Sequence, residues 1–157
     1  MNVGIVVFSH TGNTYSVAQR LQEKISEAGH STNLERLEVK GGFQSGAKDI
    51  QFETLPTVKN YDALVFGSPV HGFTLAKPMG TYLKQIDSLN DRKVALFVTK
   101  KLRFNWTGGN QAIGKMRKIC KSKGGNVCGS GIVIWGSKER EKMIENVTDE
   151  LYGGFGD

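Results

Sequence analysis

The segment of this chain best suited to chemistry is Ser9-His10-Thr11-Gly12-Asn13-Thr14. It follows an apolar run at residues 3–8 and precedes apolar residues at helical spacing. A helix N-terminus offers unpaired N–H groups and the positive end of the helix dipole, and the three hydroxyl groups add further donors. Gly12 lets the backbone approach a ligand closely, and Asn13 tolerates the positive φ that such a turn often needs. The segment therefore predicts a binding site for a phosphate group.

Two common kinds of phosphate loop do not fit these residues. A nucleoside triphosphate loop requires Gly-x-x-x-x-Gly-Lys-Ser/Thr, and the segment contains no lysine. A dinucleotide-binding turn requires Gly-x-Gly-x-x-Gly, and only one glycine is present. Neutral donors alone must then hold the phosphate. The alternative interpretation of these six residues is an ordinary capped helix after a strand.

The elements that must position this segment alternate along the chain. Apolar runs predict strands at residues 3–8, 31–39, 63–67, 94–99 and 127–135. Helical spacing predicts helices around residues 17–28, 78–86, 113–120 and 143–151, and residues 40–60 are expected to be extended or looped. Five mostly apolar strands separated by helices favour a doubly wound α/β fold, with one parallel sheet covered on both faces. We expect residues 1–157 to form one such domain.

Two further loops are expected beside the phosphate loop. We expect the strand order 2-1-3-4-5, a common order of doubly wound sheets, in which ligands bind at the carboxyl ends of strands 1 and 3. The loop after the third predicted strand contains Ser68, Pro69, Val70, His71, Gly72 and Phe73, and the loop after the fourth begins at Thr99 and Lys100 and contains Phe104, Asn105, Trp106 and Gly108. Aromatic and imidazole rings in otherwise polar or glycine-rich loops suit a flat ring ligand.

Together the three loops resemble those of the flavodoxin family. Residues 9–14 match its phosphate loop, Thr/Ser-x-Thr-Gly-x-Thr, at every fixed position, and the resemblance extends over nearly the whole chain. No long insertion interrupts the fifth predicted strand, which is typical of short-chain flavodoxins. The resemblance implies a flavodoxin-like five-stranded fold, FMN as the cofactor and electron transfer as the function.

The resemblance also implies roles for individual residues. His71 takes the place of the aromatic or methionine side chain on the inner face of the flavin, and Phe104 or Trp106 that of the outer stacking tyrosine. Because the second position of the phosphate loop varies in the family, the side chain of His10 is expected to point outward. The residues expected at the cofactor are Ser9, His10, Thr11, Gly12, Asn13, Thr14, Ser68, Pro69, Val70, His71, Gly72, Thr99, Lys100, Phe104, Asn105, Trp106 and Gly108.

Charge is distributed unevenly along the chain. The net charge is +6, and residues 91–124 carry ten Lys and Arg but one acidic residue. Flavodoxins are typically acidic, so the family's partner does not carry over; we expect a redox protein with an acidic docking surface. No recognised nucleic-acid motif accompanies the basic residues, and no nucleic-acid partner is expected.

The remaining composition limits the setting of the protein. No apolar stretch reaches the length of a membrane span, and a cytoplasmic location is expected. Two cysteines exclude an iron–sulfur centre with four ligands from this chain, and no metal site is expected. We expect a monomer or a weak dimer.

Two other functions remain as alternatives. One is an FMN-dependent NAD(P)H or quinone oxidoreductase, which needs a substrate pocket over the flavin, usually built by insertions or by a partner subunit. With 157 residues the chain has little length to spare for it, which favours the carrier. The other is a binding module without redox activity, and the intact loop at residues 9–14 argues against it.

Overall fold

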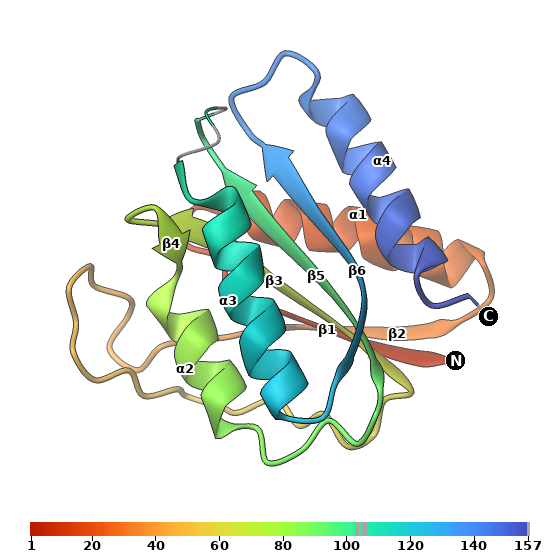
Figure 1. Cartoon of the computed structure of the whole chain (residues 1–157), viewed down its shortest axis with the longest axis horizontal. Coiled ribbons are helices and arrows are strands. Elements are labelled where there is room, and N and C mark those ends of the chain that lie inside the picture. The colour runs from red at the N-terminus through yellow and green to blue at the C-terminus, as the bar shows by residue number, and fades with distance from the viewer. Residues whose placement is uncertain (103, 105–106, 157) are drawn as a thin grey trace.

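Five strands pair side by side in parallel, in the order β2-β1-β3-β5-β6 (Figure 1). The structure is a computed structural model that describes residues 1–102, 104 and 107–156. Its strands are β1 (Asn2–Val7), β2 (Ser31–Arg36), β3 (Ala63–His71), β4 (Thr74–Leu75), β5 (Lys93–Lys100) and β6 (Asn126–Ile134). Its helices are α1 (Asn13–Glu27), α2 (Lys77–Gln85), α3 (Gly109–Ser122) and α4 (Arg140–Gly153). The predicted order 2-1-3-4-5 is confirmed, since the short β4 only pairs with the end of β3.

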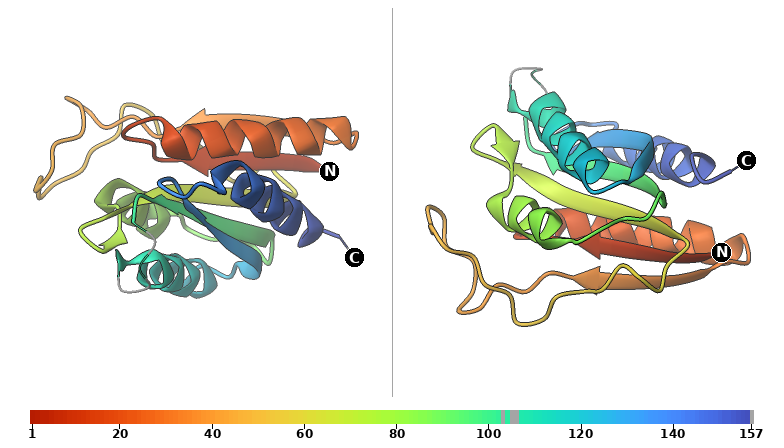
Figure 2. Two further views of the ribbon diagram at one scale, coloured as in Figure 1. Left: turned by 90° about the horizontal axis from the view of Figure 1, so that it is seen from above. Right: turned by 60° about the horizontal axis from the view of Figure 1, so that its bottom comes forward.

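Helices cover both faces of the sheet, as predicted. Successive side chains of a strand point to opposite faces, so Val6 packs with the helices of one face and Val7 with those of the other. The first face carries α2 and α3, and the second carries α1 and α4 (Figure 2). None of the helices in the described part of the chain is long and apolar enough to span a membrane.

Strand β3 is longer than its sequence pattern predicts. The prediction ended it at Gly67, but pairing with β5 continues to Pro69 opposite Thr99. The chain then folds back through the two-residue turn Gly72-Phe73, with φ of 56° and 64°, and β4 pairs antiparallel with the end of β3. The placement of Ser68, Pro69, Val70 and His71 in a loop is therefore wrong: they lie on a strand, because two neighbours supply its hydrogen bonds.

The segment between β2 and β3 contains no regular element among its described residues apart from one bridge between Val39 and Phe52. It is anchored to the core by the buried side chains of Ile50, Phe52 and Val58. Figure 1 shows the part around residues 40–48 extending past the carboxyl end of the sheet. This segment, which we call the 40s loop over residues 40–48, reaches the edge where a ligand is expected.

Candidate functional site

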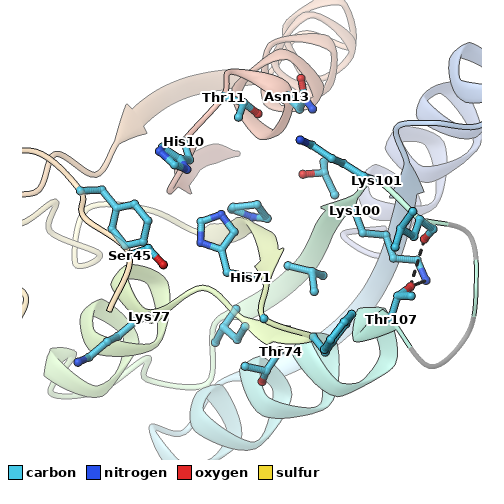
Figure 3. Close-up of a pocket in the computed structure, with 18 of the residues that line it drawn as sticks. His10, Thr11, Asn13, Ser45, His71, Thr74, Lys77, Lys100, Lys101 and Thr107 are labelled. Carbon is cyan, nitrogen blue, oxygen red and sulfur yellow. Dashed lines mark hydrogen bonds between the residues drawn. The ribbon is translucent and has the colours of Figure 1, made fainter. Parts of the chain in front are cut away.

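A cavity of about 940 Å³ opens at the carboxyl edge of the sheet (Figure 3). Its walls come from the loop after β1, the 40s loop, the β3–β4 hairpin, the start of α2 and the loop after β5. Nine of the residues expected at a cofactor line it: His10, Thr11, Asn13, Pro69, Val70, His71, Gly72, Thr99 and Lys100. Six others, Ser9, Gly12, Thr14, Ser68, Phe104 and Gly108, lie nearby or behind its wall, and Asn105 and Trp106 lie outside the described residues.

The loop after β1 turns sharply into α1 at Gly12. Gly12 has a φ of 95°, and a Cβ built there would meet no atom within 4 Å, so the backbone conformation rather than space requires glycine. Asn13 is already the first residue of the helix. The positive φ of this turn is therefore taken by Gly12 and not by Asn13.

The hydroxyl groups of this loop divide into two sets. Ser9 and Thr14 are buried, and their side chains bond within the protein: the Tyr15 N–H donates to Ser9 Oγ over 3.2 Å, and Thr14 Oγ1 lies 2.9 Å from Thr99 Oγ1. Thr11 is exposed and lines the cavity. Ser9 and Thr14 thus fix the shape of the loop, while Thr11 and the N-terminal end of α1 are left to contact a ligand.

Four rings cluster at one side of the cavity. The ring centroid of His71 lies 5.6 Å from that of His10 and 5.4 Å from that of Phe43, and Phe8 packs against Phe43 at 5.2 Å. His10 also packs edge-on against Phe43 at 5.1 Å. The expectation that His10 points away from the site is wrong, because the two neighbouring rings hold it at the cavity wall.

Phe43 was missed by sequence reasoning. It lies in the 40s loop, where no periodic pattern identifies it, and its only signal is a large apolar side chain among glycines. Lys77 at the start of α2 fastens this loop, since its Nζ donates to the carbonyl oxygen of Ala47 over 2.6 Å and to that of Lys48. Phe43 is thereby held beside a site that the sequence assigned to other segments.

His71 is half-buried at the end of β3. Burial lowers the pKa of its imidazole below the usual value, and the nearby imidazole of His10 lowers it further. At neutral pH the ring is therefore uncharged. An uncharged imidazole beside two phenyl rings suits a flat aromatic ligand.

The ammonium group of Lys100 bonds to the loop after β5, although its position in the sequence predicts contact with the cofactor. Its side chain is 9% exposed, and its Nζ donates to the Phe104 carbonyl oxygen over 3.0 Å and to Thr107 Oγ1 over 3.1 Å (Figure 3). Burial lowers the pKa of Lys100. Its ammonium group holds the start of the loop after β5, whereas Lys101 is exposed at the cavity wall. Arg103, the next basic residue of the sequence, lies outside the described residues.

Gly108 supports the site from behind. It precedes α3 with a φ of 100°, and a Cβ built there would lie 2.2 Å from the carbonyl carbon of Phe73. The turn of the β3–β4 hairpin therefore rests directly on the backbone at the start of α3. This contact fixes Gly72 and Phe73 at the mouth of the cavity.

The residues present fit a ligand with a phosphate at one end and a flat ring at the other. The N-terminal end of α1, Thr11 and Asn13 form a polar end. The rings of His10, Phe43 and His71 form an aromatic side. Among the described residues, the cavity is lined by three lysines and by no carboxylate. A bound phosphate would therefore meet no negative side chain that repels it.

Comparison with known proteins points to one family. The family model of the flavodoxin domain matches residues 4–124. No curated protein shows significant sequence similarity to the chain.

Solved structures share the fold at low sequence identity. Oxidised flavodoxin 2 from Bacillus cereus is 18% identical, with a TM-score of 0.71, over 99% of this chain and 100% of that one. The flavodoxin of Fusobacterium nucleatum bound to flavin mononucleotide is 16% identical, with a TM-score of 0.64, over 99% of each chain. A flavoprotein from Lactobacillus acidophilus NCFM in complex with FMN is 21% identical, with a TM-score of 0.64, over 90% of this chain and 97% of that one.

The matched region contains the loop at residues 9–14, the β3–β4 hairpin and the loop after β5, which are three of the five segments that form the cavity walls. The strand order and the place of the cavity agree with that match. The chain therefore belongs to the flavodoxin domain family.

Proposed function

We propose that this protein binds FMN and carries electrons between redox proteins. The observation that carries the proposal is the left-handed turn at Gly12, which aims the N-terminal end of α1 and Thr11 into a cavity with aromatic walls. The cofactor is FMN. It supplies the redox chemistry when bound, and the protein binds it, orients it and adjusts the energy of its charged forms.

The residues of the chain divide the work of binding. Thr11, Asn13 and the backbone at Gly12 hold the phosphate, while Ser9 and Thr14 keep the loop in shape. Around the ring we assign His10, Pro69, Val70, His71, Gly72, Thr99, Lys100 and Phe104, together with Asn105 and Trp106 from their place in the sequence, and Phe43 is added from the structure. Ser68 and Gly108 are assigned to the support of this wall from behind.

A carrier is favoured over an enzyme with its own substrate. Flavodoxin 2 of Bacillus cereus aligns with 99% of this chain and 100% of its own, so the alignment contains no large inserted segment to build a second pocket. We further propose that the chain acts as a single domain in the cytoplasm, as a monomer or a weak dimer.

The partner is expected to have an acidic docking surface. Lys115, Lys118 and Lys121 are exposed along α3, and Lys101 is exposed at the mouth of the cavity. Among residues 91–124 the one acidic residue is Asp91, which precedes β5 and so lies at the opposite edge of the sheet from the cavity. Lys101 thus lies at the cavity mouth, and the lysines of α3 extend the basic surface from there toward Gly124, which bonds to Asp91 at the other end of the sheet.

The test is reconstitution followed by stepwise reduction. The purified protein, loaded with FMN, is reduced with a one-electron donor and mixed with an oxidised acceptor protein of acidic surface. Reversible reduction of bound FMN and its reoxidation by the acceptor are expected. A protein that takes up FMN but gives no electrons to any acceptor would contradict the carrier role, and one that takes up no FMN would contradict the whole proposal.

A further inference from the structure

The imidazole rings of His10 and His71 lie in contact at the wall of the cavity. Their ring centroids lie 5.6 Å apart and their planes are inclined by 74° (Figure 3). They come from different elements, the loop after β1 and the end of β3, and both line the cavity. Within the described part of the chain, neither ring has a hydrogen-bond partner, so both keep nitrogen atoms available for a proton.

The charges around this pair are all positive. The cavity wall contributes Lys77 from α2 and Lys100 and Lys101 from β5 and the loop after it. Behind the phosphate loop, Arg36 of β2 donates to the carbonyl oxygen of Ser9 over 2.6 Å. The 40s loop adds only uncharged residues to the lining, at positions 43–47, and no carboxylate from the described chain reaches it.

The ammonium groups of Lys77 and Lys100 donate hydrogen bonds to protein acceptors, and that of Lys101 is exposed to solvent. Lys77 bonds to carbonyl oxygens of the 40s loop, and Lys100 bonds to Phe104 and Thr107. The imidazoles therefore remain as the groups in the cavity that can gain positive charge near neutral pH. Without an anion, burial and the nearby imidazole of His10 oppose a proton on His71, as the lowered pKa of His71 indicates.

We propose that His10 and His71 act together as the proton acceptor when the flavin in this cavity is reduced to its anion. Two electrons from a one-electron donor protein and one proton convert the oxidised ring to the singly protonated anion. A second proton from solvent then binds to one imidazole of the pair instead of to the ring, so the cavity gains no net charge. This inference rests on the proposed function. It adds a pair of residues that sets how the reduction potential of the bound FMN depends on pH.

The protonation of the two cavity imidazoles can be followed by NMR, because the chain contains only three histidines and their signals are easily told apart. The third, His30, lies away from the cavity, where it bonds to the N-terminal amine and to Tyr152. Imidazole signals are followed by NMR against pH in the FMN-loaded protein, oxidised and fully reduced. They are assigned with the single variants His10→Gln, His71→Gln and His30→Gln.

We expect reduction to raise the proton affinity of one cavity imidazole at least about tenfold, which is about one pKa unit, and to leave His30 unchanged. Either cavity substitution should flatten the pH dependence of the second reduction of FMN around neutral pH, while His30→Gln retains it. Equal titration of His10 and His71 in the two redox states would overturn the inference.

Failure of the inference is separable from failure of the proposed function. Bound FMN that is reduced reversibly while both cavity imidazoles titrate as before contradicts only the proton acceptor. Absence of FMN binding contradicts the function itself, and the proton acceptor with it. Should His71→Gln fail to fold, the wild-type titration still decides, because its two cavity signals either move or do not.

Discussion

The hydroxyl oxygen of Thr14, in the first turn of α1, lies 2.9 Å from that of Thr99 near the end of β5, and both side chains are buried. The two residues are 85 positions apart in the chain. Their hydrogen bond joins the phosphate loop, which follows β1, to the carboxyl end of β5, and β3 lies between these two strands in the sheet. The loop is thus held in shape before any ligand binds.

This bond leads to a prediction about stability. Thr99→Val should lower the free energy of unfolding by about 1–3 kcal/mol, because the Thr14 hydroxyl is left buried without its partner. The double variant Thr14→Val/Thr99→Val should recover part of that loss. Urea unfolding of the wild type, Thr14→Val, Thr99→Val and the double variant checks it, and strictly additive changes would show that the two hydroxyls do not interact.

Thr11 should affect binding rather than stability. Because Thr11 is exposed at the cavity, Thr11→Ala removes a donor to the phosphate, and a hydrogen bond to a charged group is worth about 1.5–3 kcal/mol. FMN affinity should fall roughly ten- to hundredfold, with unfolding unchanged. Thr54→Ala, at an exposed position outside the cavity lining, is the control. Unchanged affinity in Thr11→Ala would remove this residue from the site.

Two glycines of the same region should respond oppositely to alanine. Gly108→Ala forces a Cβ into the backbone of Phe73 and a φ of 100° on an L-residue, so it should destabilise the fold by at least about 1–3 kcal/mol. Gly114→Ala, inside α3 with no atom within 4 Å, should stabilise it by about 0.4–1 kcal/mol. Thermal unfolding distinguishes them, and equal effects would show that the hairpin does not rest on Gly108.

The charge of Lys101 should raise the potential of the second reduction of bound FMN. A cation about 6 Å from the reduced ring stabilises it by roughly 30 mV in a water-like dielectric and roughly 120 mV at an effective dielectric constant of 20. Because Lys101 is exposed, Lys101→Gln should lower that potential by about 30 mV. Lys142→Gln on α4 is the control. A potential that stays constant or rises in Lys101→Gln would show that this side chain does not act on the ring.

The rate of association with an acidic partner should depend on ionic strength because of the exposed lysines on α3. Raising ionic strength should slow electron transfer with an acidic partner, and Lys115→Glu/Lys118→Glu should slow it further at low salt. The control Lys138→Glu/Lys142→Glu makes the same charge change at and just before α4, which covers the other face of the sheet. Stopped-flow rates that respond equally to both variants would indicate net charge rather than a docking surface.

Local patterns of apolar and turn residues predicted the alternating strands and helices and the loop at residues 9–14. The strand order was predicted from the known order of flavodoxin-like sheets, because it depends on long-range pairing and not on local patterns. Sequence reasoning missed the end of β3, since pairing with β4 depends on a turn whose residues, Gly72 and Phe73, carry no standard hairpin signal. It also missed Phe43, whose position beside His71 is set by the course of an irregular loop. The orientation of Lys100 could not be predicted either, because its acceptors depend on the fold of the following loop.

The most direct test of the account is to compare FMN with riboflavin, which lacks the phosphate. The cofactor-free protein is titrated with each, and flavin fluorescence or calorimetry gives the two dissociation constants. If the loop at residues 9–14 holds the phosphate through two or more charge-assisted hydrogen bonds, FMN should bind at least about 100-fold more tightly. Equal affinity for the two flavins, or no binding of either, would contradict the assignment of this cavity as an FMN site.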